Sequence, residues 1–220
     1  MKSFVIIGLG RFGMALSKEL SRIGHEVLAI DYDPALISEV ADYVTHAVEA
    51  DAKNEMALKE IGLSNFDVAV ISIGSDLEAS IIATLTCKEL GIKTIIAKAT
   101  SESHGKVLSK IGANKIIFPE RDMGTRLAHN LTFKNIIDYI ELSSEYSIAE
   151  VKILKSWIGK SLLDLKLRNI YGVNVIAIKN DDKIDVSPKP DKCLGQGDVL
   201  VLLGQVDDIS ALEKDSQNEQ

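Results

Sequence analysis

Two hydrophobic periods alternate along the first 120 residues of this chain. Apolar runs of strand length lie at 3–7, 26–30, 44–48, 67–73, 94–97 and 115–118. Segments with helical spacing of their apolar residues lie between them, at 12–23, 35–42, 53–61, 77–90 and 103–111. The run 68–71 is apolar on both faces, as strands of a helix-covered parallel sheet are. The alternation predicts an α/β fold over residues 1–120, with a doubly wound parallel Rossmann-like sheet.

The pattern changes after Phe118-Pro119-Glu120. The residues that follow predict one helix and then a second amphipathic segment at 135–140. We interpret 121–143 as a pair of crossover or dimerisation helices. The polar stretch 143–146 is the best candidate for a linker.

Residues 144–212 predict a second, smaller α+β lobe. Its expected strands lie at 147–153, 173–179, 183–187 and 199–203, with short helices near 160–167 and after Asp207. We expect a hairpin turn at 180–182 and a second turn at 194–198. Because so short a lobe has a small core, we expect it to dimerise and bury more apolar surface. Residues 213–220 predict a polar tail.

The first strand runs directly into a glycine-rich turn, Gly8-Leu9-Gly10-Arg11-Phe12-Gly13, and Asp31 follows the second apolar run. In such a turn the first glycine allows the tight bend, and the second lets the backbone approach phosphate. The third lets helix and strand pack closely, while the helix points its unpaired N–H groups at the phosphates. Asp31 can accept hydrogen bonds from ribose hydroxyl groups. The sequence therefore predicts a nucleotide site at Gly8, Gly10, Gly13 and Asp31.

Other polar residues follow the carboxyl ends of the predicted strands, where ligands of such sheets bind. Arg11 either pairs with phosphate or is a solvated charge. Asp33 is more typical of a cap for the helix that Pro34 begins, although it can also contact a ligand. Asp51 either accepts from the exocyclic amine of adenine or caps the helix that follows it.

Two further residues at this edge have open interpretations. A carboxylate beside phosphate is repulsive unless a cation lies between them, so a functional Glu120 implies a bound metal. Pro119-Glu120 is more often simply the start of a helix. His104 either reaches a phosphate or begins the fifth helix.

The composition narrows the classes of function. The chain has 25 Lys and Arg against 32 Asp and Glu, a net charge of -7, which argues against a nucleic-acid-binding surface. Cys87 and Cys193 have no metal-binding spacing, so we expect reduced thiols in a cytoplasmic protein. The longest apolar runs, such as 199–203, are far below the ~20 residues that span a bilayer. We therefore expect any membrane role to come through a partner.

Catalytic groups are not apparent in the sequence. A dehydrogenase needs a second domain that holds substrate and an acid–base group facing the nicotinamide. The C-terminal lobe is too small for the first requirement and contains no histidine for the second. His25 and His46 lie in or beside predicted strands, where structural roles fit better. We predict a nucleotide sensor rather than an enzyme; the alternative is an NAD-dependent oxidoreductase or an NADH-responsive redox sensor.

Four segments, at 5–13, 110–113, 119–123 and 171–178, together resemble the RCK (KTN) gating proteins. The resemblance covers residues 1–212 and is to the KtrA/KtrC type of cytoplasmic subunit of bacterial potassium uptake systems, relatives of TrkA. It implies dimers that assemble into an octameric ring at the inner face of the cell membrane, beneath a KtrB/KtrD-like potassium channel subunit. It further implies that ATP favours an active ring and ADP an inactive one, with NAD(H) as another ligand.

Carried to matching positions, the resemblance implies a larger set of nucleotide contacts. They are Gly10, Arg11, Asp31, Asp33, Asp51, Ala52, Ile73, Gly74, Ser75, Lys98, Ala99, Thr100, His104 and Glu120. In the family, the arginine of the turn reaches phosphate across the dimer, and the glutamate of the Pro-Glu motif helps to hold a cation, monovalent or divalent, between nucleotides. Met14 departs from the glycine of many members, and Asp33 from an asparagine found in some.

The smaller lobe of the resembling family can bind cyclic di-AMP, an inhibitor of potassium uptake. A dimer of such lobes has a symmetric cleft, which suits a two-fold symmetric ligand. The resemblance implies that Arg168 pairs with a phosphate of this ligand and that Asn174 forms a hydrogen bond with it. Leu163, Leu165, Ile170 and Val175 lie nearby in the sequence, and either contact the bases or form an ordinary core.

Overall fold

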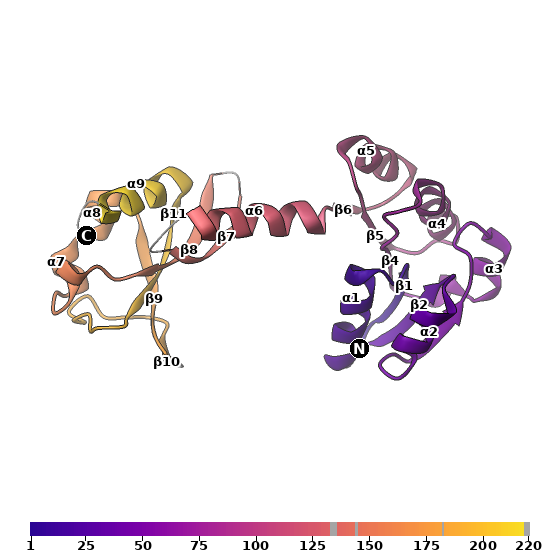
Figure 1. Cartoon of the computed structure of the whole chain (residues 1–220), viewed down its shortest axis with the longest axis horizontal. Coiled ribbons are helices and arrows are strands. Elements are labelled where there is room, and N and C mark those ends of the chain that lie inside the picture. The colour runs from indigo at the N-terminus through magenta and orange to yellow at the C-terminus, as the bar shows by residue number, and fades with distance from the viewer. Residues whose placement is uncertain (133–135, 144, 182, 218–220) are drawn as a thin grey trace. The chain divides into compact units, whose positions relative to one another are not determined.

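The computed structural model describes residues 1–132, 136–143, 145–181 and 183–217. It divides the chain into two compact units, Met1–Glu120 and Arg121–Gln220. Each unit has its own sheet and its own hydrophobic core (Figure 1).

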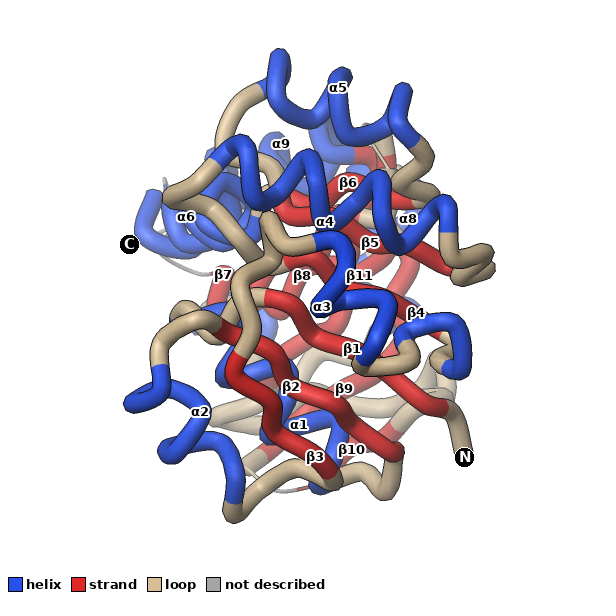
Figure 2. Tube along the Cα trace, turned by 90° about the vertical axis from the view of Figure 1, so that its right-hand side faces the viewer, coloured by secondary structure: helices blue, strands red, loops and turns tan. Residues whose placement is uncertain are grey.

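The first unit is built on six parallel strands in the order β3-β2-β1-β4-β5-β6. Figure 2 shows β3, β2, β1 and β4 side by side in that order. The chain order of the strands reverses between β1 and β4, which makes this the switch point of a doubly wound sheet. The strands are β1 Ser3–Ile7, β2 Glu26–Asp31, β3 His46–Glu49, β4 Val68–Ile71, β5 Thr94–Lys98 and β6 Lys115–Ile117. The parallel Rossmann-like sheet expected from the sequence is confirmed.

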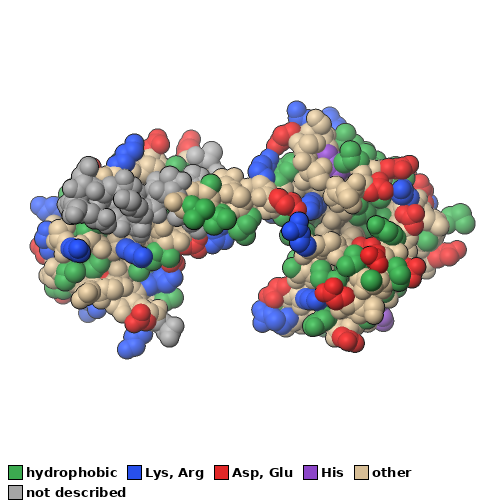
Figure 3. Space-filling view, in the orientation of Figure 1, with side chains coloured by type: hydrophobic (Ala, Val, Ile, Leu, Met, Phe, Trp, Pro, Cys, Tyr) green, Lys and Arg blue, Asp and Glu red, His purple; other side chains and the backbone are tan. Residues whose placement is uncertain are grey.

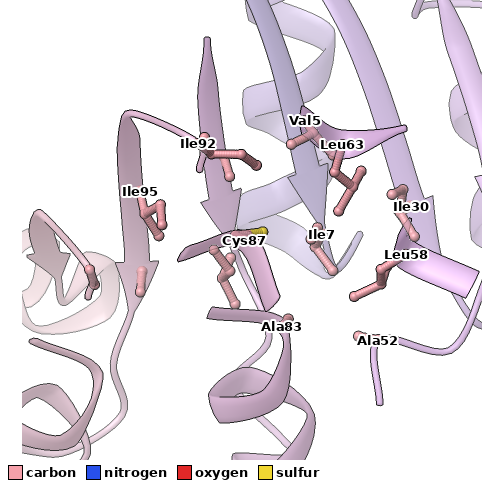
Figure 4. Close-up of a cluster of buried hydrophobic side chains, with 14 of the residues drawn as sticks. Val5, Ile7, Ile30, Ala52, Leu58, Leu63, Ala83, Cys87, Ile92 and Ile95 are labelled. Atoms are coloured by element: carbon pink, nitrogen blue, oxygen red, sulfur yellow. The ribbon is translucent and has the colours of Figure 1, made fainter. Parts of the chain in front are cut away.

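Helices cover both faces of this sheet. On one face, Val5 and Ile7 of β1 pack with Leu58 of α3 and with Ala83 and Cys87 of α4 (Figure 4). The other face packs against α1 and α2 in two separate clusters. The helices are α1 Arg11–Arg22, α2 Pro34–Ala41, α3 Glu55–Glu60, α4 Leu77–Glu89 and α5 Glu102–Ile111, with a 3-10 turn η1 at Leu63–Asn65. Coverage on both faces explains why the strands are apolar on both faces.

The second unit contains an antiparallel sheet in the order β10-β9-β11-β8-β7. Its strands are β7 Ile136–Glu141, β8 Tyr146–Lys152, β9 Asn174–Asn180, β10 Lys183–Asp185 and β11 Val199–Gln205. The helix α6, Pro119–Thr132, begins with the last two residues of the first unit and continues into the second. The other helical segments are η2 Lys155–Trp157, α7 Leu162–Leu165, α8 Leu167–Tyr171 and α9 Val206–Gln217. Trp157, Leu200 and Ile209 are among the residues that form one buried core between helices and sheet.

The predicted pair of helices at 121–143 is wrong in its second half. α6 is followed by the strand β7, which pairs antiparallel with β8. Ile136 and Tyr139 are both buried although they are three residues apart, because the register shifts between Ile136 and Asp138. Because of this bulge, the buried residues of the strand are spaced as in a helix rather than at every second position. Asn135, which the predicted segment included, lies outside the described residues.

Two smaller expectations also change, and a third agrees with the structure. The proposed linker at 143–146 is the turn of the β7–β8 hairpin, where the Leu142 N–H donates to the Tyr146 carbonyl at 2.9 Å; Ser144 lies outside the described residues. The tail from 213 is helical through Gln217, since α9 buries Ile209 and Leu212 on the core. The hairpin expected at 180–182 joins β9 and β10, and Asp182 lies outside the described residues.

Candidate nucleotide-binding site

A cavity of about 290 Å³ lies at the carboxyl ends of β1 to β4. This is the switch point, where doubly wound sheets bind their ligands. The wall contains eight of the residues predicted from the sequence: Gly8, Gly10, Asp31, Asp51, Ala52, Ile73, Gly74 and Ser75. The structure therefore brings together residues that are up to 67 positions apart in the chain.

The three glycines of the turn occupy different environments. Gly8 has a φ of +98°, and a Cβ there would lie 2.9 Å from Ile73 Cγ1. A Cβ on Gly13 would lie 2.0 Å from the Gly8 carbonyl oxygen. At Gly10 no atom lies within 4 Å of a built Cβ. Gly8 and Gly13 thus permit the turn and its close packing, whereas Gly10 borders open space.

The amino end of α1 differs from those of the next four helices. Asp33, Asn54, Asp76 and Ser101 each cap a helix by accepting a backbone hydrogen bond, in α2, α3, α4 and α5 respectively. In the described structure of α1, the cap position is Gly10, with no side-chain cap and no acidic residue in the first turn. Its N–H groups and positive dipole end are thus left to a ligand or to water, as at anion-binding helix ends.

Asp31 fastens the turn to the end of β2. Its buried carboxylate accepts from the Leu9 N–H at 2.6 Å through Oδ2, and from the Asp33 N–H at 2.9 Å through Oδ1. Each carboxylate oxygen can accept a second hydrogen bond. Asp31 therefore shapes the turn and keeps capacity for a ribose hydroxyl group.

The two other acids near the cavity have local partners. Asp33 Oδ1 accepts from the Ala35 N–H at 2.8 Å, which confirms it as the cap of α2. Asp51 Oδ1 accepts from the Lys53 N–H at 2.9 Å, and Asn54 is the cap of α3. The alternative in which Asp51 caps that helix is therefore wrong.

Glu120 is paired with a lysine. Lys98 Nζ donates to Glu120 Oε1 at 2.5 Å, and this bond holds the pKa of the Glu120 carboxyl below its ordinary value. Among the described residues no group of three or more His, Cys, Asp or Glu is placed to hold a metal ion. Among the described residues, Lys98 supplies a positive charge directly beside the Glu120 carboxylate.

The remaining predicted contacts lie off the cavity wall. His104 is buried in the first turn of α5; burial lowers the pKa of its imidazole, and Nδ1 is 3.4 Å from the Thr100 nitrogen. Arg11 and Thr100 are exposed, and Ala99 is buried in the core. Thr100 and Lys98 nevertheless lie beside the wall, because a Cβ on Gly74 would be 3.5 Å from Lys98 Nζ and 3.5 Å from Thr100 Cγ2.

Matches to two known domain families show the family to which this chain belongs. The TrkA-N domain matches residues 4–119, and the TrkA-C domain matches residues 148–216. This chain belongs to the Ktr/TrkA family. The Ktr system potassium uptake protein C of Bacillus subtilis (strain 168) is 47% identical over 213 residues, 97% of this chain and 96% of that protein. The Ktr system potassium uptake protein A of the same organism is 44% identical over 214 residues, with the same coverage.

The Ktr/TrkA fold is also found in a solved channel. The GsuK channel bound to NAD has a TM-score of 0.51 and 23% identity, covering 99% of this chain and 39% of that chain. Together these relatives confirm the predicted family and fold. They also confirm the prediction of a non-enzymatic protein, since the Ktr proteins are potassium uptake proteins. Among its described residues, no helix of this Ktr/TrkA chain is long and apolar enough to cross a membrane.

Sequence reasoning missed four polar residues of the cavity wall in this Ktr/TrkA chain: Tyr32, Lys53, Ser72 and Asp76. Tyr32 and Lys53 lie one or two positions beyond predicted contacts, so the strand-end argument could have included them. Asp76 was detectable as a helix cap, because it precedes an apolar helix and accepts from the Ala79 N–H.

In the C-terminal unit of this Ktr/TrkA chain, Arg168 lies in α8 and Asn174 begins β9, and both are exposed. Leu163 and Ile170 are 66% and 63% exposed. In contrast, Leu165 is buried in the core and Val175 packs against it. The neighbouring apolar residues thus divide between the core and the surface.

Proposed function

We propose that this chain is a nucleotide-binding regulatory subunit of a potassium uptake system, which binds ATP or ADP and thereby controls a membrane channel subunit. The observation that carries the nucleotide part is the uncapped amino end of α1, which begins at a cavity-lining glycine. Membership of the Ktr/TrkA family supports the proposed role in potassium uptake.

The cavity suggests how the nucleotide lies. Phosphate oxygens accept from the first N–H groups of α1, and Asp31 accepts from the ribose hydroxyl groups. Asp51 and Ala52 border the adenine, whose exocyclic amine can donate to the Asp51 carboxylate. NAD(H) shares this adenosine half, whereas the 2′-phosphate of NADP would lie against Asp31.

The proposed assembly is a homodimer that forms a ring against a KtrB/KtrD-like channel subunit at the cytoplasmic face of the membrane. Met123, Leu127 and Leu131 recur every four residues along α6 and are 59%, 53% and 78% exposed. Figure 3 shows hydrophobic side chains gathered over this helix. An exposed apolar stripe of this spacing suits pairing with a second copy of the helix.

The C-terminal unit is proposed to bind cyclic di-AMP, one molecule per dimer. Exposed Arg168 supplies the charge for a phosphate, and exposed Asn174 a hydrogen bond. Leu163 and Ile170 are the exposed apolar residues available for the bases.

Potassium flux tests the regulatory function. The full chain and its membrane subunit are placed in vesicles, and flux is measured with saturating ATP or saturating ADP. We expect greater flux with ATP, because a ligand shifts an equilibrium only by its differential affinity for the two states. Equal flux with the two nucleotides would contradict the mechanism.

Binding itself is tested by Gly10→Ala. The added Cβ meets no atom within 4 Å and Gly10 has a φ of −58°, so we expect the thermal unfolding temperature to stay close to wild type. The methyl group projects into the open space assigned to phosphate, so ATP affinity measured by calorimetry should fall at least tenfold. Unchanged affinity would rule out phosphate at this turn.

A further inference from the structure

An ion pair joins two walls of the cavity, and the proposed function assigns no role to this pair. Lys53 Nζ lies 2.9 Å from Asp76 Oδ2 and 3.7 Å from Glu78 Oε2. Lys53 follows β3, whereas Asp76 follows β4, and the strands β2 and β1 lie between them in the sheet. Lys53 and Asp76 both contribute to the cavity wall. The pair therefore links two walls of the cavity that come from non-adjacent strands.

Asp76 is held in place independently of Lys53. Its Oδ1 accepts from the Ala79 N–H at 3.0 Å as the cap of α4, which leaves Oδ2 for the lysine. The Lys53 N–H is in turn held by Asp51 Oδ1. The hydrogen bond to Asp76 raises the pKa of the Lys53 ammonium group. The pKa of the Asp76 carboxyl is lowered, first by the hydrogen bond from the Ala79 N–H and second by the hydrogen bond from Lys53. Both groups are thus charged at neutral pH, and only the long lysine side chain has to move for the link to open.

The position of the pair points to the base end of the site. Lys53 directly follows Asp51 and Ala52, which border the adenine in the proposed binding mode. The glycine turn, which faces the phosphates, follows β1 instead. We propose that the Lys53–Asp76 ion pair is a latch that closes the base end of the nucleotide site and slows nucleotide release. This inference rests on the proposed nucleotide binding and makes Lys53 a positioning residue.

The latch has a kinetic signature. The two side chains are 39% and 40% exposed, and exposed ion pairs are weak. We therefore expect Lys53→Gln to release nucleotide about two- to fivefold faster than wild type. The factor should be the same for ADP and ATP, because the pair does not face the phosphates. In about 1 M salt the wild-type rate should rise to that of the variant, since screening removes the attraction.

Release is measured on the full chain loaded with radiolabelled ADP, chased with excess unlabelled ADP and sampled by rapid filtration. Asp76→Asn should match Lys53→Gln, because asparagine retains an oxygen for the cap but loses the charge. The double variant should release no faster than either single one, and Lys53→Arg should restore slow release. Lys59→Gln, which breaks the Glu55–Lys59 pair of α3 away from the cavity wall, is the matched control and should release at the wild-type rate.

Two results would overturn the latch: wild-type release from Lys53→Gln at low salt, or additive acceleration in the double variant. A structural role alone would lower the unfolding temperature of the ligand-free protein without a salt-dependent release rate. Equilibrium binding of ADP to the wild type is measured first. Its absence would refute the proposed nucleotide function and the latch together, whereas binding with unchanged release would refute the latch alone.

Discussion

At the scale of single residues, Asp31 combines two tasks. Its carboxylate accepts from the backbone N–H groups of Leu9 and Asp33, and so it holds the glycine turn in the shape that exposes the end of α1. The sequence indicated only a ribose contact. The backbone bonds could not be predicted, because they depend on where the turn lies relative to the end of β2.

We expect Asp31→Ala to weaken ATP binding at least tenfold and also to lower the unfolding temperature. A hydrogen bond to a charged group is worth about 1.5–3 kcal/mol, and the variant loses two such bonds to the backbone and one to ribose. Calorimetry below the unfolding transition separates the two effects. Asp67→Asn is the matched control, since Asp67 accepts from the Ser3 N–H at 3.0 Å outside the cavity wall. Unchanged affinity in Asp31→Ala would refute the site.

The two cysteines should differ in reactivity. Burial in the core raises the pKa of the Cys87 thiol to about 12, while Cys193 is exposed. Because the thiolate is the reactive form, only Cys193 should react with a disulfide reagent at pH 8 in the native protein. Both should react in denaturant, and native Cys193→Ser should show no rapid reaction. Two rapidly reacting thiols in the native wild type would contradict the packing of α4.

At the scale of elements, helix ends and strands differ in how far sequence predicts them. Asp33 before Pro34 was recognisable as a cap, and the parallel strands were recognisable because they are apolar on both faces. β7 was not, because its bulge places buried Ile136 and Tyr139 at helical spacing. The Lys98–Glu120 pair was also missed, since it joins β5 to α6 across 22 residues. The local sequence pattern thus predicts most helices and strands. Contacts between elements that are distant in the chain can be identified only once the fold is known.

The strand assignment of β7 predicts unequal effects of two neighbouring substitutions. Tyr139 is 5% exposed and belongs to the C-terminal core, whereas Ile140 is 48% exposed. Tyr139→Ala should cost about 3–5 kcal/mol, as expected for truncation of a buried aromatic side chain, and Ile140→Ala under about 1 kcal/mol. Urea unfolding followed by fluorescence of Trp157, the only tryptophan in the chain, measures both. Equal losses would indicate that the alternation of a strand is absent here.

At the scale of the whole molecule, the two units have separate cores and separate candidate sites. The cavity is formed by residues 7–79, while Arg168 and Asn174 lie in the second unit. The family resemblance could be recognised from the sequence and is confirmed over both units. The residues of each proposed site come from a single unit of the chain.

Separate sites predict that each ligand can be lost without the other. In the full chain, Arg168→Ala should weaken cyclic di-AMP at least tenfold, because a charge-assisted bond to phosphate is worth about 1.5–3 kcal/mol. Its ATP affinity should stay within a factor of two. Asp31→Ala should show the opposite pattern, losing ATP and retaining cyclic di-AMP. Lys166→Ala, which removes an exposed charge two residues from Arg168, controls for loss of charge alone. Calorimetry with both ligands on all three variants decides the matter: if Arg168→Ala binds cyclic di-AMP like wild type, the proposed C-terminal site is wrong, whatever the result for ATP.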